Sequence, residues 1–378
     1  MQQTLRPYVT AGIAILGSGL IVANPVVMAP VSGADMRDVA LTASTTLPDL
    51  LAPWLAIYNQ AAENATTLTQ NFLLAPGVAL QQILANQTHF LQQIIDDPAN
   101  IPAVMQQMQS NLDAVLTGFT SFNASEATIK TVNYHTLSPS DAGTLTIGHD
   151  LLFTLLPQFL PANLSTALEP VIDFLASPLS GIMIGLAGPL MSPGVALLDS
   201  IVAGDNPLQI LASPLDGFLN GATLNLDFLV PLISSLNLLP SGTAITALDF
   251  AFGGLLSPGS VGGGAYQVTD QAGQTVNVDP VGGSIFNSLG LTLHQSLLPI
   301  SQLDIASQGV GPIAALEGWD QAMGALLGSG WTWSGKGPIE VSPPWPGISF
   351  PTFDDGGAGA GAATDVLADL GGLMGFDH

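Results

Sequence analysis

Apolar side chains recur with helical spacing in two neighbouring segments of the chain. In residues 78–95 they lie near one face, and Gln and Asn fill most of the remaining positions, which is typical of an amphipathic helix. The second segment has apolar residues at Ile101, Val104, Met105, Met108, Leu112, Val115, Leu116 and Phe119. Asp96-Asp97-Pro98 separates the segments, and Asn100 is a candidate N-cap of the second. The pattern predicts a helical hairpin.

Residues 151–256 form a strongly apolar stretch with seven acidic residues and no Lys, Arg or His. Prolines recur throughout the stretch, and a proline inside a helix costs about 3 kcal/mol. We therefore expect short helices that begin or end near most of these prolines. The motif LASPLSG at residues 175–181 returns as LASPLDG at residues 211–217, which predicts a duplicated helix–turn–helix unit.

Within this stretch, residues 174–198 carry no charge. The run is long enough to span a bilayer, which takes about 20 residues, and Gly181-x-x-x-Gly185 is a small-residue pattern of helix packing. Pro178, Pro189 and Pro193 divide it into pieces shorter than a span. The prolines favour buried or oligomer-facing helices, and a spanning helix stays open as the alternative.

Alternating polarity appears in one place. Residues 266–269 and 275–278 alternate around a polar turn that contains glycine, which predicts a β-hairpin. Residues 285–298 and 313–327 read as helices, and residues 128–134 carry a weak strand signal. The fold class that follows is mainly α: a bundle of short helices punctuated by proline and glycine, with a small β-hairpin near 266–278.

The domain organisation follows from these patterns and from the amino-terminal segment. Arg6, the apolar run Ala11–Ala23 and the small residues Ser32-Gly33-Ala34 are the three parts of a secretory signal. The apolar run is too short for a comfortable membrane anchor. The expected parts are a signal peptide at 1–34, an amino-terminal helical region at 35–120, a linker at 121–147, an apolar helical core with the β-hairpin at 148–327, and a Gly/Pro-rich tail at 328–378.

Charge restricts the partners of this protein. The chain has 28 acidic residues against four basic ones, for a formal net charge of −24. Nucleic acids and anionic lipid headgroups both need Lys or Arg to neutralise phosphate, so binding to either is disfavoured. The chain has no Cys, which excludes disulfides and thiolate chemistry.

Catalytic motifs are absent from the sequence. It has no Gly-x-Ser-x-Gly, no His-Glu-x-x-His and no Gly-x-x-x-x-Gly-Lys phosphate loop. The five histidines are scattered without the spacing of metal ligands. We therefore expect no enzymatic activity, no cofactor and no metal site.

Several phrases of the sequence point to one family. The start MQQTLRPYVTAGIAI resembles the export signal of the mycobacterial GjpA-type outer-membrane porin family. Residues 77–90 (GVALQQILANQTHF), 204–226 (GDNPLQILASPLDGFLNGATLNL) and 252–260 (FGGLLSPGS) are similar to phrases of that family in the same order. The resemblance implies export to the mycolic-acid envelope, contact with its lipid, and a role as a channel for small hydrophilic solutes. It brings no catalytic residues.

Two functions remain open at this point. The first is an envelope or outer-membrane protein that oligomerises into a water-filled pore, in which lining carboxylates would favour cations. The candidate lining residues are Asp173, Asp199, Asp205, Asp216 and Asp227. The second is a soluble, secreted helical protein for binding or scaffolding, whose apolar stretch is core.

Overall fold

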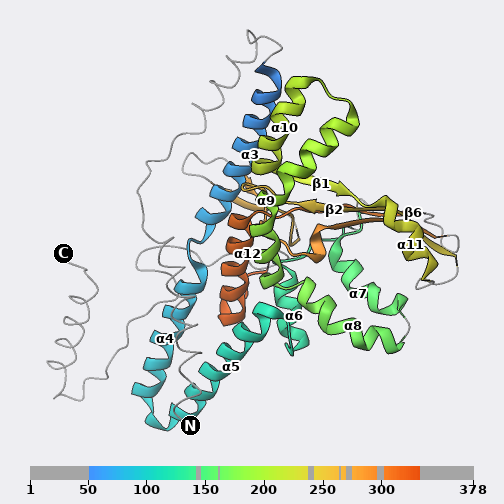
Figure 1. The fold of residues 1–378 in the computed structure, drawn as a ribbon. Coiled ribbons are helices and arrows are strands. Elements are labelled where there is room, and N and C mark those ends of the chain that lie inside the picture. The colour runs from blue at the N-terminus through green and yellow to red at the C-terminus, as the bar shows by residue number, and fades with distance from the viewer. Residues whose placement is uncertain are drawn as a thin grey trace, which may run out of the picture.

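The computed structural model describes residues 51–141, 146–160, 162–236, 242–263, 265–269, 275–295 and 302–332. These residues are mainly α-helical, as predicted, with two small antiparallel sheets (Figure 1). The helices are α3 (Ala52–Leu74), α4 (Val78–Asp96), α5 (Ile101–Thr120), α6 (Glu126–Asn133), α7 (His149–Phe159), α8 (Ala162–Leu175), α9 (Pro178–Ala203), α10 (Pro207–Asn220), α11 (Val230–Ser235) and α12 (Pro312–Gly324). Shorter turns are η2 (Pro98–Asn100), η3 (Asp227–Leu229), η4 (Phe286–Ser288) and η5 (Ala325–Ser329). The strands are β1 (Ala222–Asn225), β2 (Thr243–Phe252), β3 (Tyr266–Thr269), β4 (Thr275–Val278), β5 (Leu289–Gln295) and β6 (Gln302–Ile305).

Two parts of the predicted organisation cannot be compared with the structure. The predicted signal peptide at 1–34 lies outside the described residues, as does the predicted tail from residue 333 onward.

The predicted helical hairpin is confirmed as α4 and α5, which diverge from η2 like the arms of a V (Figure 1). Helix α12 and its extension η5 pack against both arms. The predicted N-cap is wrong. The Asp97 carboxylate accepts the N–H of Ala99 at 2.9 Å and caps η2, whereas Asn100 already has helical backbone angles. The Asn100 side chain instead donates to the carbonyl of Gln93 at 3.0 Å and ties the two arms together.

The sheets agree with the sequence in part. The β-hairpin near 266–278 is confirmed as β3 and β4. A four-stranded antiparallel sheet in the order β1-β2-β5-β6 was not expected. Strands β1 and β2 precede the hairpin in the chain, and β5 and β6 follow it. The helix predicted for residues 285–298 is wrong, because η4 and then β5 occupy those residues. Leu291 and Leu293 of β5 belong to a core cluster to which α7 and α8 also contribute buried side chains, so a period of two was present in the sequence there.

The range predicted as a linker contains a helix and core residues. Residues 126–133 form α6, so the weak strand signal at 128–134 was wrong. Ser125 caps this helix by accepting the N–H of Thr128 at 3.1 Å. His135 and Leu137 follow and are 1% exposed. This part of the chain therefore belongs to the packed core.

Helix α9 overturns the expected effect of proline. It runs without a break over 26 residues, with Pro189 and Pro193 inside it. Pro178 begins α9 and Pro207 begins α10, as expected, but α7, α8 and α10 also contain an internal proline. Propensity is a weak rule that packing can override, and α9 packs against α10, α12, β1 and β2.

That packing uses glycine. A Cβ added to Gly181 would lie 2.1 Å from the carbonyl oxygen of Gly283. A Cβ added to Gly185 would lie 3.0 Å from the carbonyl oxygen of Gly311, and one added to Gly188 would lie 2.2 Å from that of Gly253. Gly181 and Gly185 of the small-residue pattern, together with Gly188, therefore leave room for loop backbones, and Gly185 also lies against Pro312 at the start of α12.

The two LASPL motifs do not form a structural repeat. In the first, Ser177 caps α9 by accepting the N–H of Ser180 at 3.2 Å, and Pro178 is in the first turn. In the second, Ser213 and Pro214 lie inside α10, because Asn206 has already capped that helix. The prediction of a duplicated helix–turn–helix unit is wrong: the flanking caps decide where each helix begins.

Candidate functional site

The surface of α9 that points away from the three loops is apolar. We define the outer face of α9 by seven large side chains, each at least half exposed: Met183, Leu186, Leu190, Met191, Leu198, Ile201 and Val202. Leu190 is 80% exposed and Val202 86%. Asp199 is the only charged residue on the helix. A run of this kind on a soluble protein marks an interaction site.

Helix α9 has the length and apolar composition to cross a membrane, and it is the one such helix in the described ranges. Only 39% of its most apolar window is buried, so one side of the helix is packed and the other is exposed. Helix α10 packs beside it and adds three more exposed apolar side chains, Leu211, Leu215 and Phe218.

A groove lies between α3, α9 and α10. Its volume is about 610 Å³, and three of the five acids proposed from the sequence line it, Asp199, Asp205 and Asp216. Further polar lining comes from Gln60, Gln209, Ser200 and Ser213. We call this hollow the acidic groove. It brings together residues that the sequence could only propose one by one.

Two of these carboxylates are held by neighbouring donors. The Ser200 hydroxyl donates to Asp205 Oδ2 at 2.6 Å, and the Asn220 amide donates to Asp216 Oδ1 at 2.7 Å. The Asn220 amide also reaches the carbonyl of Ile57 on α3 at 3.3 Å. These contacts fix the walls of the groove, and no basic side chain lines it. The groove therefore offers negative charge to a cation. Among the described residues, no group of His or acidic side chains has the geometry to hold a metal ion.

The other two proposed acids lie elsewhere. Asp173 is on α8, where burial, together with the charge of Glu169, raises its pKa to about 6. Asp227 accepts the N–H of Leu248 at 2.9 Å and the Asn225 amide at 2.9 Å. These hydrogen bonds lower its pKa, and they fasten η3 to β2.

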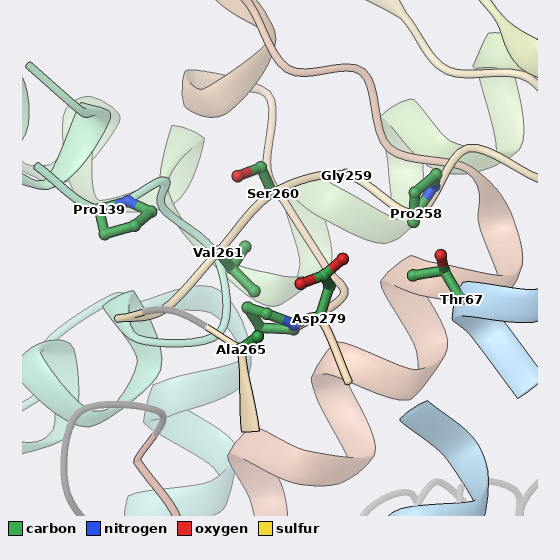
Figure 2. A pocket seen from close by; sticks show the side chains of 9 residues that line it. Thr67, Pro139, Pro258, Gly259, Ser260, Val261, Ala265 and Asp279 are labelled. Carbon is green, nitrogen blue, oxygen red and sulfur yellow. The ribbon is translucent and has the colours of Figure 1, made fainter. Parts of the chain in front are cut away.

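A second, smaller hollow of about 290 Å³ lies at the loop before the β-hairpin. Figure 2 shows the side chains of Thr67, Ser260 and Asp279 around it. The rest of the lining is proline, glycine, alanine and valine. One carboxylate and two hydroxyls without a base do not form a nucleophilic centre.

Ser138 and His149 are in contact, but both are enclosed. His149 is fully buried, and its Nε2 lies 2.7 Å from the carbonyl oxygen of Leu289. A carbonyl only accepts, so Nε2 carries the proton and Nδ1 accepts the Ser138 hydroxyl at 2.8 Å. Burial lowers the pKa of His149. The pair pins the start of α7 to β5 and has no access for a substrate.

An acidic pair on α12 has perturbed pKa values that the sequence did not single out. Burial, together with the charge of Asp320, raises the pKa of Glu317 to about 8. Burial raises that of Asp320 to about 6, opposed by hydrogen bonds from the N–H groups of Ala79 and Val78. Asp320 therefore caps the start of α4, where Gly77 offers no side chain. The signal in the sequence was the spacing of three residues between Glu317 and Asp320, which places both on one side of a helix.

Comparison with family models, with curated proteins and with solved structures found no match to this chain.

Proposed function

We propose that this protein is an exported protein of the cell envelope that attaches to a lipid layer through the outer face of α9. The observation that carries the proposal is the row of seven large apolar side chains exposed on one helix. Complete removal of such a side chain from water is worth roughly 1.5–3 kcal/mol. Seven partly exposed side chains together favour lipid by roughly 5 to 10 kcal/mol.

The packing of α9 supports attachment in the plane of the lipid rather than a crossing. Its glycine face is in contact with loop backbones at Gly253, Gly283 and Gly311, so only the outer face is free to meet lipid. An interfacial helix usually adds Lys or Arg that attract anionic headgroups. This helix has none, and the chain carries a net charge of −24. The lipid it suits is neutral, and the resemblance to GjpA-type porins supports the mycolic-acid layer.

The resemblance also supports a channel, which is a separate function because it needs a water-filled path across the lipid layer and not attachment in its plane. Several copies would have to assemble around such a path, because one copy offers one groove. Asp199, Asp205 and Asp216 of the acidic groove are the acids that would face such a path. Carboxylates along a pore favour cations, so the proposed channel passes small cations in preference to anions.

Vesicle flotation tests attachment, and planar-bilayer recording tests the channel. We expect the full chain to float with neutral phosphatidylcholine vesicles and to float less with vesicles that contain phosphatidylserine. Protein that stays at the bottom of the gradient with neutral vesicles would refute attachment. In the planar bilayer we expect cation-selective conductance. Attachment without conductance, or with anion selectivity, would refute the channel alone.

The acidic groove supports a second candidate, a secreted binding protein for a small organic cation. Its volume of about 610 Å³ is within the range of small-molecule sites. Titration calorimetry with spermidine at low ionic strength tests this function. Binding that weakens on Asp216→Asn supports it, and absence of heat with the intact chain counts against it.

A further inference from the structure

The hollow at the loop before the β-hairpin contains polar side chains that the fold does not use. Its volume is about 290 Å³, and Thr67 of α3, Ser260 of the loop and Asp279 after β4 line it. None of these three side chains makes a hydrogen bond to another residue in the part of the chain that the structure describes. No basic side chain is among the lining residues, so none there neutralises the Asp279 carboxylate. The hollow therefore offers one negative charge and two hydroxyls to a ligand.

Two buried amide side chains fix the backbone around the hollow. The Asn71 amide donates to the carbonyl of Asp279 at 2.9 Å, and the Asn287 amide donates to the carbonyl of Ser260 at 2.9 Å. Both asparagines are fully buried, at 0% exposure. The Asn287 side-chain oxygen also accepts the N–H of Ser138 at 2.7 Å, one residue before a proline that lines the hollow. The walls are therefore set before a ligand enters, which lowers the cost of binding.

The arrangement suits an organic cation better than a metal ion. Figure 2 shows the Asp279 carboxylate between the side chains of Ser260 and Thr67. A carboxylate only accepts hydrogen bonds, whereas a hydroxyl both donates and accepts them. An ammonium group on Asp279 and hydroxyl groups toward Thr67 and Ser260 would satisfy all three side chains. Ca²⁺ takes about six to eight oxygen ligands, and no group of three or more acidic or His side chains that could hold a metal ion occurs among the described residues.

The size and the apolar walls of the hollow restrict the ligand further. A volume of about 290 Å³ lies at the small end of ligand pockets, which span roughly 300–1,000 Å³, so it suits a single ring or a short chain. Three prolines and Val261 form most of the apolar lining and can pack on the C–H groups of a ring. We propose that the hollow binds an amino sugar of one ring, with its ammonium group on Asp279 and its hydroxyl groups on Thr67 and Ser260. The hollow shares no lining residue with the acidic groove, and the proposal does not depend on attachment to lipid.

Ligand-observed saturation-transfer NMR with the full chain tests the proposal, at a slightly acidic pH where the amine is protonated and the carboxylate is ionised. Glucosamine is the probe, and glucose is its matched control, because the two differ only in the ammonium or hydroxyl group on one ring carbon. We expect saturable binding of glucosamine, and binding of glucose at least about tenfold weaker, since the charge-assisted bond to Asp279 is lost. A rise in NaCl concentration should weaken the binding of glucosamine and leave that of glucose unchanged.

Variants of single residues locate the site. Asp279→Asn keeps the size of the side chain and the backbone carbonyl that Asn71 holds, and it should weaken glucosamine binding at least about tenfold, to the level of glucose. Thr67→Val should weaken the binding of both sugars several-fold, because it removes one hydroxyl. Asp216→Asn removes the same charge from the acidic groove and should change glucosamine binding by less than about twofold. Absence of glucosamine binding, equal binding of glucose, or binding that Asp279→Asn leaves intact would overturn the proposal. So would a loss of binding on Asp216→Asn, which would assign the cation to the acidic groove.

Discussion

Helices α9 and α5 both expose apolar side chains, but their surroundings differ. On α9 the apolar surface is wide, the opposite side is glycine in contact with loops, and only Asp199 carries a charge. On α5 the exposed apolar side chains form one narrow seam, and amides occupy much of the rest of the helix. A wide apolar face loses more contact with water when it meets lipid than a narrow row of apolar side chains bordered by amides does. The width of an exposed apolar surface therefore matters as much as the hydrophobicity of its residues.

The inner face of α9 should be far less tolerant than its outer face. In Gly188→Val the new side chain would begin 2.2 Å from the carbonyl oxygen of Gly253. We expect a loss of more than about 4 kcal/mol in the free energy of unfolding. Gly194 is the control, since it has no atom within 4 Å of an added Cβ. Gly194→Ala should stabilise by about 0.5–1 kcal/mol. Chemical denaturation followed by circular dichroism measures both, and equal effects would refute the difference between the faces.

Glu317 and Asp320 lie on α12, which packs against both α9 and α5. The folded pKa of Glu317 is raised from 4.5 to about 8, so the protonated form stabilises the native state. That stability is fully present below about pH 4.5 and is lost as the pH rises through 8.

Glu317→Gln keeps the neutral form at every pH. We expect equal stability of variant and parent near pH 4.5, and a variant more stable by roughly 2 to 4 kcal/mol above pH 8. Melting temperatures across this pH range measure the difference. Parallel curves for the two proteins would contradict the burial of Glu317.

A crossed pair of variants separates the two apolar surfaces. M191Q/L198Q should reduce binding to neutral vesicles about tenfold, because two of seven exposed apolar side chains lose their gain in lipid. M105Q/L112Q should leave vesicle binding unchanged. Flotation at several lipid concentrations gives both constants. Equal losses in the two variants would show that attachment depends on general hydrophobicity and not on the outer face of α9.

The smallest effect concerns the acidic groove. Replacement of Asp199, Asp205 and Asp216 by Asn removes three charges from its lining. If the proposed channel forms, the ratio of cation to anion permeability should fall several-fold, with conductance retained. Reversal potentials in a salt gradient measure the ratio. Asp227→Asn is the control, since Asp227 lies outside the groove, and it should leave the ratio unchanged.

The elements whose structure depends on residues close together in the sequence were predicted correctly. The α4–α5 hairpin and the β3–β4 hairpin were found because each has its own period and turn. Proline misled the prediction for α9, because contacts with Gly253, Gly283 and Gly311 hold the helix together from distant parts of the chain. Strand β5 was read as a helix, although it has alternating leucines, of which Leu291 pairs with Leu248 and Ile305 of the neighbouring strands.

The site was predictable to a similar extent. Asp199, Asp205 and Asp216 stood out as rare charges in an apolar stretch. That they share a groove depends on α3, which forms the third wall from residues more than a hundred positions away. The sequence also did not show which side of α9 is exposed, because leucine occupies both buried and exposed positions.

Because the chain has no cysteine, one labelled cysteine at a time can report which surface meets lipid. A polarity-sensitive fluorophore is attached to Leu190→Cys on α9 or to Leu112→Cys on α5, and neutral vesicles with a lipid-borne quencher are added. We predict a blue shift and strong quenching for the label on α9, and neither for the label on α5. Quenching of both labels to the same extent, or of the label on α5 alone, would contradict attachment through the outer face of α9.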